Sequence, residues 1–159
     1  MIITLTRKRN RLKDFSYTGN YAYLVTICAY KKQPYFTDKN LIDLIIAELK
    51  KAVKQFSFNV CAYCFMPDHL HLILIGGENS NLITCLKIFK QITGYYFRQN
   101  YKKVLWQKSF YERVIRKQES LKDTAYYVFN NPVRKGMVKD FRKYPFLGSF
   151  LIDVRELVP

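Results

Sequence analysis

Short apolar stretches with the character of β-strands alternate along this chain with two longer stretches that have the period of an amphipathic helix. The strand-like stretches are rich in β-branched and aromatic residues and end at turn signals; they cover residues 21–30, 58–65, 69–75 and 109–116. The helical stretches cover residues 40–56 and 82–101, and a third helix is expected to begin at Ser120 and to stop at Asn131-Pro132. The order β-α-β-β-α-β, followed by a helix, predicts an α+β fold with a ferredoxin-like antiparallel sheet. RNA-recognition modules use the same order of elements.

The length and the apolar content favour one folded domain. The chain has 159 residues, of which 49% are hydrophobic, with only six glycines and five prolines. These values exclude wholesale disorder and low-complexity or collagen-like chains. We expect a single domain over residues 1–159, made of a basic N-terminal arm (1–20), a core (21–148) and a C-terminal tail (149–159). The sequence predicts no structure for the tail.

A strong excess of positive charge indicates the class of partner. The 27 Lys and Arg residues outnumber the 12 Asp and Glu residues, which gives a formal net charge of +15. Such a chain is expected to bind a polyanion, with nucleic acid favoured over an anionic membrane surface. The basic residues of the N-terminal arm are either a solvated segment or a phosphate-binding one; they include Arg7, Lys8, Arg9 and Arg11.

The four cysteines and the apolar runs bear on the compartment. No secretory signal is visible, and no apolar run approaches the ~20 residues of a membrane helix, so we expect a cytoplasmic protein with reduced thiols. Cys61 and Cys64 have the spacing of half a zinc site, but a second such pair is missing from the sequence. In a regular strand their side chains would point to opposite faces, which argues against a shared metal.

The two histidines of the chain, His69 and His71, are separated by one leucine at the start of a predicted strand. Residues i and i+2 of a strand share a face, so the imidazoles are either a pair of metal ligands or two ordinary histidines. On the third predicted helix, Tyr127 and Asn131 are four residues apart and therefore one turn from each other. A hydrolytic metal site would need a third ligand and a reacting group. An ordinary reading is equally open, because Asn before Pro is a common end of a helix.

Three motifs in this order resemble those of one protein family. They are Met66-Pro67-Asp68-His69-Leu70-His71, the segment 105–116 with the pattern Trp-Gln-x-x-Phe-x-Glu, and residues 127–136, which contain Asn131-Pro132-Val133-Arg134-Lys135-Gly136. The chain resembles the REP-associated tyrosine transposases, a branch of the HUH single-strand DNA transposases, from about residue 21 to residue 148. The resemblance implies that His69 and His71 bind a metal, that Tyr127 on the added helix is the nucleophile, and that Asn131 is the third metal ligand. Tyr126 lies beside Tyr127, but only Tyr127 is one full turn before Asn131.

The resemblance also implies a reaction and a substrate. We expect a Mg²⁺- or Mn²⁺-dependent enzyme that cleaves and rejoins single-stranded DNA beside hairpins through a 5′-phosphotyrosine intermediate. Besides the arm, the residues expected to contact DNA phosphates are Lys87, Lys90, Arg134 and Lys135. The expected setting is a bacterial, nucleoid-associated protein in the cytoplasm. A monomer is expected, with a homodimer as the alternative.

Two other functions remain open at this point. A non-catalytic RNA- or DNA-binding module could use the same order of elements; it would bind without a metal, so a chelator would barely affect it. A replication initiator or relaxase of the HUH class is a further alternative, against which the segments 105–116 and 127–136 argue.

Overall fold

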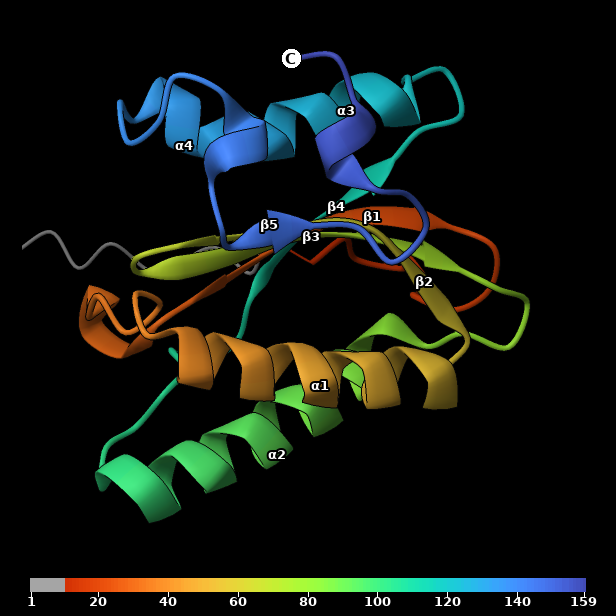
Figure 1. Cartoon of the computed structure of the whole chain (residues 1–159). Helices are drawn as coiled ribbons and strands as arrows, with labels where there is room; N and C mark the ends of the chain where they lie inside the picture. The colour runs from red at the N-terminus through yellow and green to blue at the C-terminus, as the bar shows by residue number, and fades with distance from the viewer. Residues whose placement is uncertain (1–10) are drawn as a thin grey trace, which may run out of the picture.

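In a computed structural model that describes residues 11–159, a central β-sheet lies between two layers of helices (Figure 1). The helices are α1 Lys39–Gln55, α2 Leu82–Tyr101, α3 Leu121–Phe129 and α4 Asn131–Arg134, with short 3-10 turns η1 Tyr30–Lys32, η2 Phe141–Lys143 and η3 Val154–Glu156. The strands are β1 Ala22–Cys28, β2 Phe58–Met66, β3 His69–Gly76, β4 Tyr111–Ile115 and β5 Leu147–Gly148. The order of elements predicted from the sequence is confirmed. Arg7, Lys8 and Arg9 lie outside the described residues.

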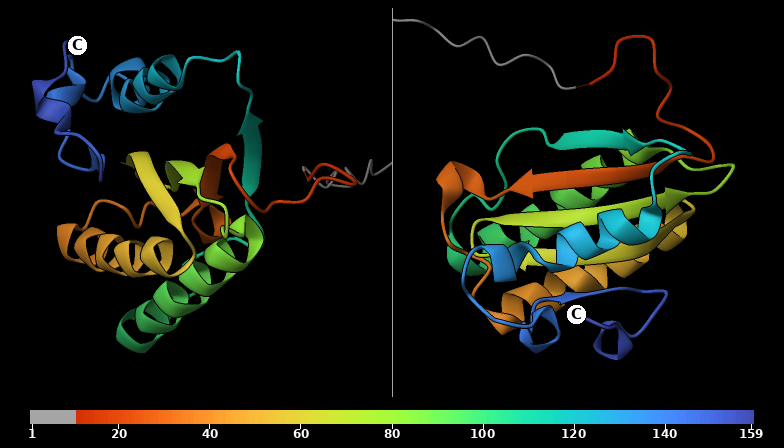
Figure 2. Two further views of the ribbon diagram at one scale, coloured as in Figure 1. Left: turned by 90° about the vertical axis from the view of Figure 1, so that its right-hand side faces the viewer. Right: turned by 90° about the horizontal axis from the view of Figure 1, so that it is seen from above.

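The sheet has the strand order β4-β1-β3-β2-β5, and each neighbouring pair is antiparallel. Helices α1 and α2 cover one face, while α3, α4 and the C-terminal segment cover the other (Figure 2). The α+β fold with an antiparallel sheet is therefore confirmed, with β5 as a fifth strand that the sequence did not predict.

Strand β3 divides its side chains between these two layers. Leu70, Leu72 and Leu74 are fully buried in the cluster formed with α1 and α2. Ile73 belongs instead to the cluster on the α3 side. Because alternate side chains of a strand share a face, His69 and His71 lie on the α3 side with Ile73. The sheet therefore presents the histidines toward the layer that carries Tyr127.

The helices begin where the capping residues predict. The Asp38 side chain accepts a hydrogen bond from Asn40 N at the start of α1, and Ser120 accepts one from Asp123 N at the start of α3. The third helix stops just before Asn131-Pro132, as predicted, but a further short helix follows that was not predicted. Helix α3 ends at Phe129, and Asn131 begins a separate short helix, α4, with Pro132 in its first turn. A proline in the first turn sacrifices no hydrogen bond, since the first N–H groups of a helix lack an intrahelical partner.

The C-terminal segment covers the edge of the sheet at β2. Strand β5 pairs with Tyr63 and Cys64, and the Tyr144 hydroxyl donates to the Phe65 carbonyl at 2.6 Å. Gly148 fits because a Cβ at that position would lie 2.5 Å from the Tyr63 hydroxyl oxygen. The contact thus depends on a residue without a side chain.

The cysteines are free thiols, as predicted, and three of them are buried. The expected opposite orientation of Cys61 and Cys64 is wrong, because a register shift between Val60 and Ala62 interrupts the alternation of β2. Both side chains contact the cluster on the α3 side. Within residues 11–159, none of the helices combines the length and the apolar character needed to cross a membrane.

Candidate active site

The side chains of His69 and His71 lie next to each other on one face of β3, at the start of the strand. The distance between His69 Nε2 and His71 Nε2 is 3.0 Å, and the ring planes are nearly perpendicular at 87°. Both side chains are partly buried. One nitrogen of each ring therefore points at the same small volume.

The other nitrogen of each ring is held by a neighbouring side chain. His69 Nδ1 lies 2.6 Å from Asp68 Oδ1, and His71 Nδ1 lies 2.9 Å from the Thr26 hydroxyl oxygen on β1. A ring that donates its Nδ1–H to such an acceptor leaves the lone pair on Nε2. This is the tautomer that a metal ligand needs.

Burial keeps His71 in its neutral form. It lowers the pKa of the imidazole to about 4, and repulsion by His69, Arg134 and Lys32 acts in the same direction. A neutral imidazole near pH 7 is available as a ligand without the loss of a proton.

The spacing of the histidine nitrogens fits a single divalent ion. Two ligands at about 2.1 Å from an octahedral ion, 90° apart, lie about 3.0 Å from each other, which is the distance between the two Nε2 atoms. Among residues 11–159, no three His, Cys, Asp or Glu side chains are grouped so that they could hold a metal. A third protein ligand would therefore have to be of another type, such as the amide oxygen of Asn131.

Arg134 connects the predicted nucleophile with the predicted third ligand. Its guanidinium carbon lies 4.1 Å from the centre of the Tyr127 ring, and its Nη2 donates to Asn131 Oδ1 at 3.0 Å. Besides burial, the charge of Arg134 contributes to the lowered pKa of His71. It also opposes the burial that raises the pKa of Cys64, the partner of His71 in the pairing of β2 with β3, to about 12. Arg134, predicted to contact phosphate, thus contacts the tyrosine and acts electrostatically on His71.

The side chain of Asn131 is buried and partly engaged. Its amide nitrogen donates to the Val128 carbonyl at 3.3 Å, and its oxygen accepts the bond from Arg134. A carbonyl oxygen has two lone pairs, so one acceptor site of Oδ1 remains. Asn131 is compatible with a ligand role on the same side of the sheet as His69 and His71.

The two neighbouring tyrosines of α3 have different surroundings. Tyr126 packs against Phe141, with ring centres 5.9 Å apart, as part of the core on the α3 side. The Tyr127 side chain is 56% exposed. A nucleophile must reach a substrate, and this favours Tyr127 over Tyr126.

Lys32 is a cation near the site that sequence reasoning missed. Its Nζ donates to Cys28 Sγ at 3.3 Å, and its charge contributes to the lowered pKa of His71. Lys31 and Lys32 both have left-handed backbone conformations, with φ of 52° and 55°, which non-glycine residues rarely adopt. Thr26 and Asp68 were missed as well, although Asp68 directly precedes the histidine motif.

The remaining predicted DNA contacts do not converge on the histidines. Lys87 and Lys90 are on α2, across the sheet from His69 and His71. The Lys90 ammonium donates to the carbonyls of Gln107 and Ser109. Lys135 is exposed at the end of α4, and Arg11 lies over the Phe110 ring.

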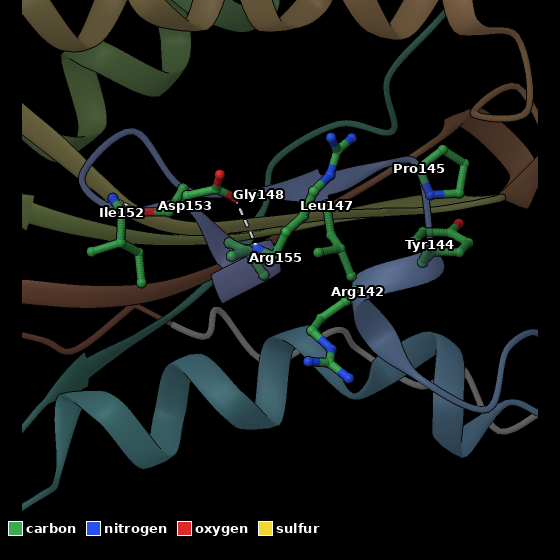
Figure 3. Close-up of a pocket in the computed structure, with 10 residues that line it drawn as sticks. Arg142, Tyr144, Pro145, Leu147, Gly148, Ile152, Asp153 and Arg155 are labelled. Atoms are coloured by element: carbon green, nitrogen blue, oxygen red, sulfur yellow. Dashed lines mark hydrogen bonds between the residues drawn. The ribbon is translucent and has the colours of Figure 1, made fainter. Parts of the chain in front are cut away.

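A separate pocket of about 270 Å³ lies in the C-terminal segment, around η2, β5 and η3 (Figure 3). Arg142 on its wall pairs with Asp140 at 2.7 Å and donates to the Leu157 carbonyl, so its charge is compensated locally. Arg155 donates its backbone N–H to the Asp153 carboxylate. The pocket contains none of the predicted site residues, and we assign it no part in the chemistry.

Comparison with known proteins agrees with this arrangement. The model of a family described as transposase, IS200-like, matches residues 17–131, which is most of the chain. The chain belongs to the IS200-like transposase family. This membership makes it a DNA transposase and confirms the resemblance found in the sequence.

Individual relatives point to one branch of this family. The REP-associated tyrosine transposase of Escherichia coli K12 is 28% identical, over 89% of this chain and 82% of its own length. A Haemophilus influenzae relative that provisionally carries the same name is 29% identical, over 94% of this chain and 90% of its own length. A solved REP-associated tyrosine transposase, bound to a REP hairpin, shares the fold with a TM-score of 0.71 and 20% identity, over 86% of this chain and 81% of that one.

Proposed function

We propose that this transposase cleaves and rejoins single-stranded DNA through a covalent bond between Tyr127 and a 5′-phosphate, at a divalent metal ion. The observation that carries the proposal is the pair of Nε2 atoms 3.0 Å apart, each on a ring whose Nδ1 is held by Asp68 or Thr26. In the protein alone the two Nε2 atoms are within hydrogen-bond distance of each other, and a bound ion would replace that contact.

In the proposed reaction Tyr127 supplies the attacking oxygen. The bond between the phenol oxygen and phosphorus forms, the bond from phosphorus to the 3′-oxygen breaks, and the phenol proton ends on the released 3′-OH. Since no water is consumed, an incoming 3′-OH can reverse the same exchange and restore the phenol. Cleavage and rejoining therefore need only one protein nucleophile.

His69, His71 and Asn131 are the residues that would hold the ion. When bound, Mg²⁺ or Mn²⁺ supplies Lewis-acid stabilisation of the charge on the phosphate oxygens. Nitrogen and oxygen ligands together are compatible with either ion. The protein's own contribution is to orient both imidazoles through Asp68 and Thr26 and to keep the His71 imidazole neutral.

Arg134 has a positioning role in this proposal. Its guanidinium lies against the Tyr127 ring, which restricts the ring, and it holds the Asn131 oxygen. Its positive charge also favours an anionic substrate beside Tyr127. Lys32, on the β1 side of the histidines, adds a second cation.

We infer that the substrate carries a DNA hairpin with a single-stranded flank. The support is the relative solved with a REP hairpin, together with the net charge of +15. We expect a monomer in which Tyr127 acts at the metal site of the same chain, because α3 packs on the sheet face that carries His69 and His71.

The test is the formation of a denaturation-stable adduct. The protein is incubated with Mn²⁺ and labelled single-stranded DNA from the flanks of its own gene, and the products are separated in denaturing gels. Tyr127→Phe should retain DNA binding and lose the adduct, whereas Tyr126→Phe should retain both. An adduct that persists in Tyr127→Phe and is lost in Tyr126→Phe would refute the assignment of the nucleophile.

A chelator separates the enzyme from a binding module. With EDTA, the adduct should disappear while DNA binding changes little. If the parent protein forms no adduct with either ion but binds the same DNA, the chain is a binding module and the proposal fails.

A further inference from the structure

The segment from Leu105 to Phe110 has no part in the chemistry proposed above, although its Trp-Gln-x-x-Phe pattern belongs to the resemblance. The Trp106 indole N–H donates to the Thr93 hydroxyl at 2.8 Å, which attaches the segment to α2. Lys90 holds the next turn through the carbonyls of Gln107 and Ser109. The segment is thus fixed against α2, and a groove of about 650 Å³ lies between them.

The rim of this groove is strongly cationic. Five basic residues line it, namely Arg11, Lys87, Lys90, Arg98 and Lys108. Residues 11–159 contribute no Asp or Glu to the lining. Burial, together with the charge of Arg11, lowers the pKa of Lys90 to about 8, as expected where cations gather without a compensating carboxylate.

The interior of the groove is apolar and aromatic. Trp106 and Phe110 are largely buried beneath it, and Tyr95 on its wall is 61% exposed. Gly94 adds no side chain to the floor, and a Cβ there would make only ordinary contact with Trp106 Cδ1 at 3.9 Å, so a small side chain would fit and a large one would fill the groove. A glycine inside a helix costs about 1 kcal/mol relative to alanine, and no contact of the fold requires it here.

The groove and the histidines lie at the same end of the sheet on opposite faces. Asp68 accepts a backbone hydrogen bond from Ala29, which in turn forms a bridge with Trp106. Only the end of β1 therefore separates His69 from the segment that lines the groove. In Figure 2 the connection from α2 to β4 follows this outer edge of the sheet.

We propose that this groove binds a single-stranded segment of the DNA substrate, with its phosphates on the cationic rim and its unpaired bases on the apolar floor. This inference rests on the proposed function. The strand that is cleaved at the histidines would continue around the end of β1 and enter the groove on the other face of the sheet. Duplex DNA would match the rim alone, since its bases are stacked inside the helix. A groove with both cations and exposed aromatic surface fits unpaired nucleotides.

Binding is measured in the Tyr127→Phe background, so that cleavage does not interfere. The probes are a fluorescent 20-residue oligothymidylate and an abasic strand of equal length, followed by anisotropy at several salt concentrations. The charge variant is Lys87→Ala with Arg98→Ala, and its matched control is Lys50→Ala with Lys54→Ala on the exposed part of α1. The floor variant is Gly94→Leu, matched by Gly94→Ala, which leaves the groove open.

The charge variant should weaken oligothymidylate binding by about 25-fold at 0.1 M salt, because each contact with a single strand contributes about 0.7 to the salt slope. The slope should fall by about 1.4, while the control stays within about twofold of the parent. The Gly94→Ala variant should bind oligothymidylate at least about tenfold more tightly than the abasic strand. Gly94→Leu should abolish this preference.

Equal losses in the charge variant and its control would overturn the inference. So would a blunt duplex that binds as tightly as oligothymidylate and depends on the same residues. The covalent adduct of the parent protein is measured separately. If the groove variants lose binding but the parent protein forms no adduct, the proposed reaction is refuted and the groove is supported. If the parent forms the adduct but the groove variants bind as tightly as the parent, only the groove is refuted.

Discussion

Replacing Thr26 by valine tests whether the histidine pair is built to hold a metal. The substitution removes the hydroxyl that lies 2.9 Å from His71 Nδ1 and keeps a β-branched side chain of similar shape in the middle of β1. Without that acceptor, the ring can rotate or can carry its proton on Nε2, the atom that faces His69. We expect the affinity for Mn²⁺ to fall while the fold persists.

The magnitude follows from the position of Thr26 behind a ligand. Loss of such a partner typically lowers metal affinity or activity by about 10- to 100-fold, or about 1.4 to 2.7 kcal/mol. The same hydrogen bond contributes only about 1 kcal/mol to the free energy of unfolding, and the strand preference of valine offsets part of that. The effect on binding should therefore exceed the effect on stability.

Electron paramagnetic resonance of free Mn²⁺ during a titration gives the affinity without any DNA, and urea unfolding gives the stability. Thr26→Ser restores the acceptor and should bind Mn²⁺ within about threefold of the parent protein. If Thr26→Val binds Mn²⁺ as tightly as the parent, Thr26 does not orient His71 toward a metal. The reasoning behind the site would then be refuted.

Three further substitutions test the structure around the site. Thr93→Val removes the acceptor of the buried Trp106 indole N–H and should cost about 1 to 3 kcal/mol in urea unfolding; a loss below 0.5 kcal/mol would contradict the hydrogen bond. The Tyr23 hydroxyl is buried without a hydrogen-bond partner among residues 11–159, so Tyr23→Phe should stabilise the protein by about 1 kcal/mol. Burial raises the pKa of Tyr23 to about 12, so between about pH 10 and pH 12 the unfolded chain ionises this phenol while the folded protein keeps it neutral, and stability falls as the pH rises; the decline should be smaller in the variant. Ser120→Ala removes the cap of α3 and should cost about 1 kcal/mol, seen as faster hydrogen exchange in that helix, and unchanged exchange would count against the cap.

The elements with regular periodicity could be predicted from the sequence, because local patterns determine them. Helix α1 follows from its capping Asp38 and from apolar residues spaced to face the sheet. The stop of α3 was predicted from Asn131-Pro132, but the start of α4 at the same residues was not, since this pair is equally compatible with the end of one helix and the start of another. Strand β5 has two residues, too few to show a period, and it exists only because β2 offers an edge.

The site shows the same division between local and long-range information. That His69 and His71 share a face follows from the period of a strand alone. Thr26 reaches His71 only because β1 pairs with β3, and Arg134 contacts Tyr127 from the separate helix α4. The left-handed turn at Lys32 has no sequence signal such as glycine. The partners that orient the predicted residues were therefore the part that the sequence did not show.

The pairing of the C-terminal segment with β2 has a consequence for self-association. An uncovered strand offers unpaired N–H and C=O groups that another chain can extend into a shared sheet. Here the backbone around Phe146 and Phe150 occupies those groups on β2, and Gly148 allows the approach to Tyr63. A larger residue at position 148 would displace β5 and expose the edge of β2 to a neighbouring molecule. The absence of a side chain at position 148 would therefore protect the protein from aggregation through this edge of the sheet.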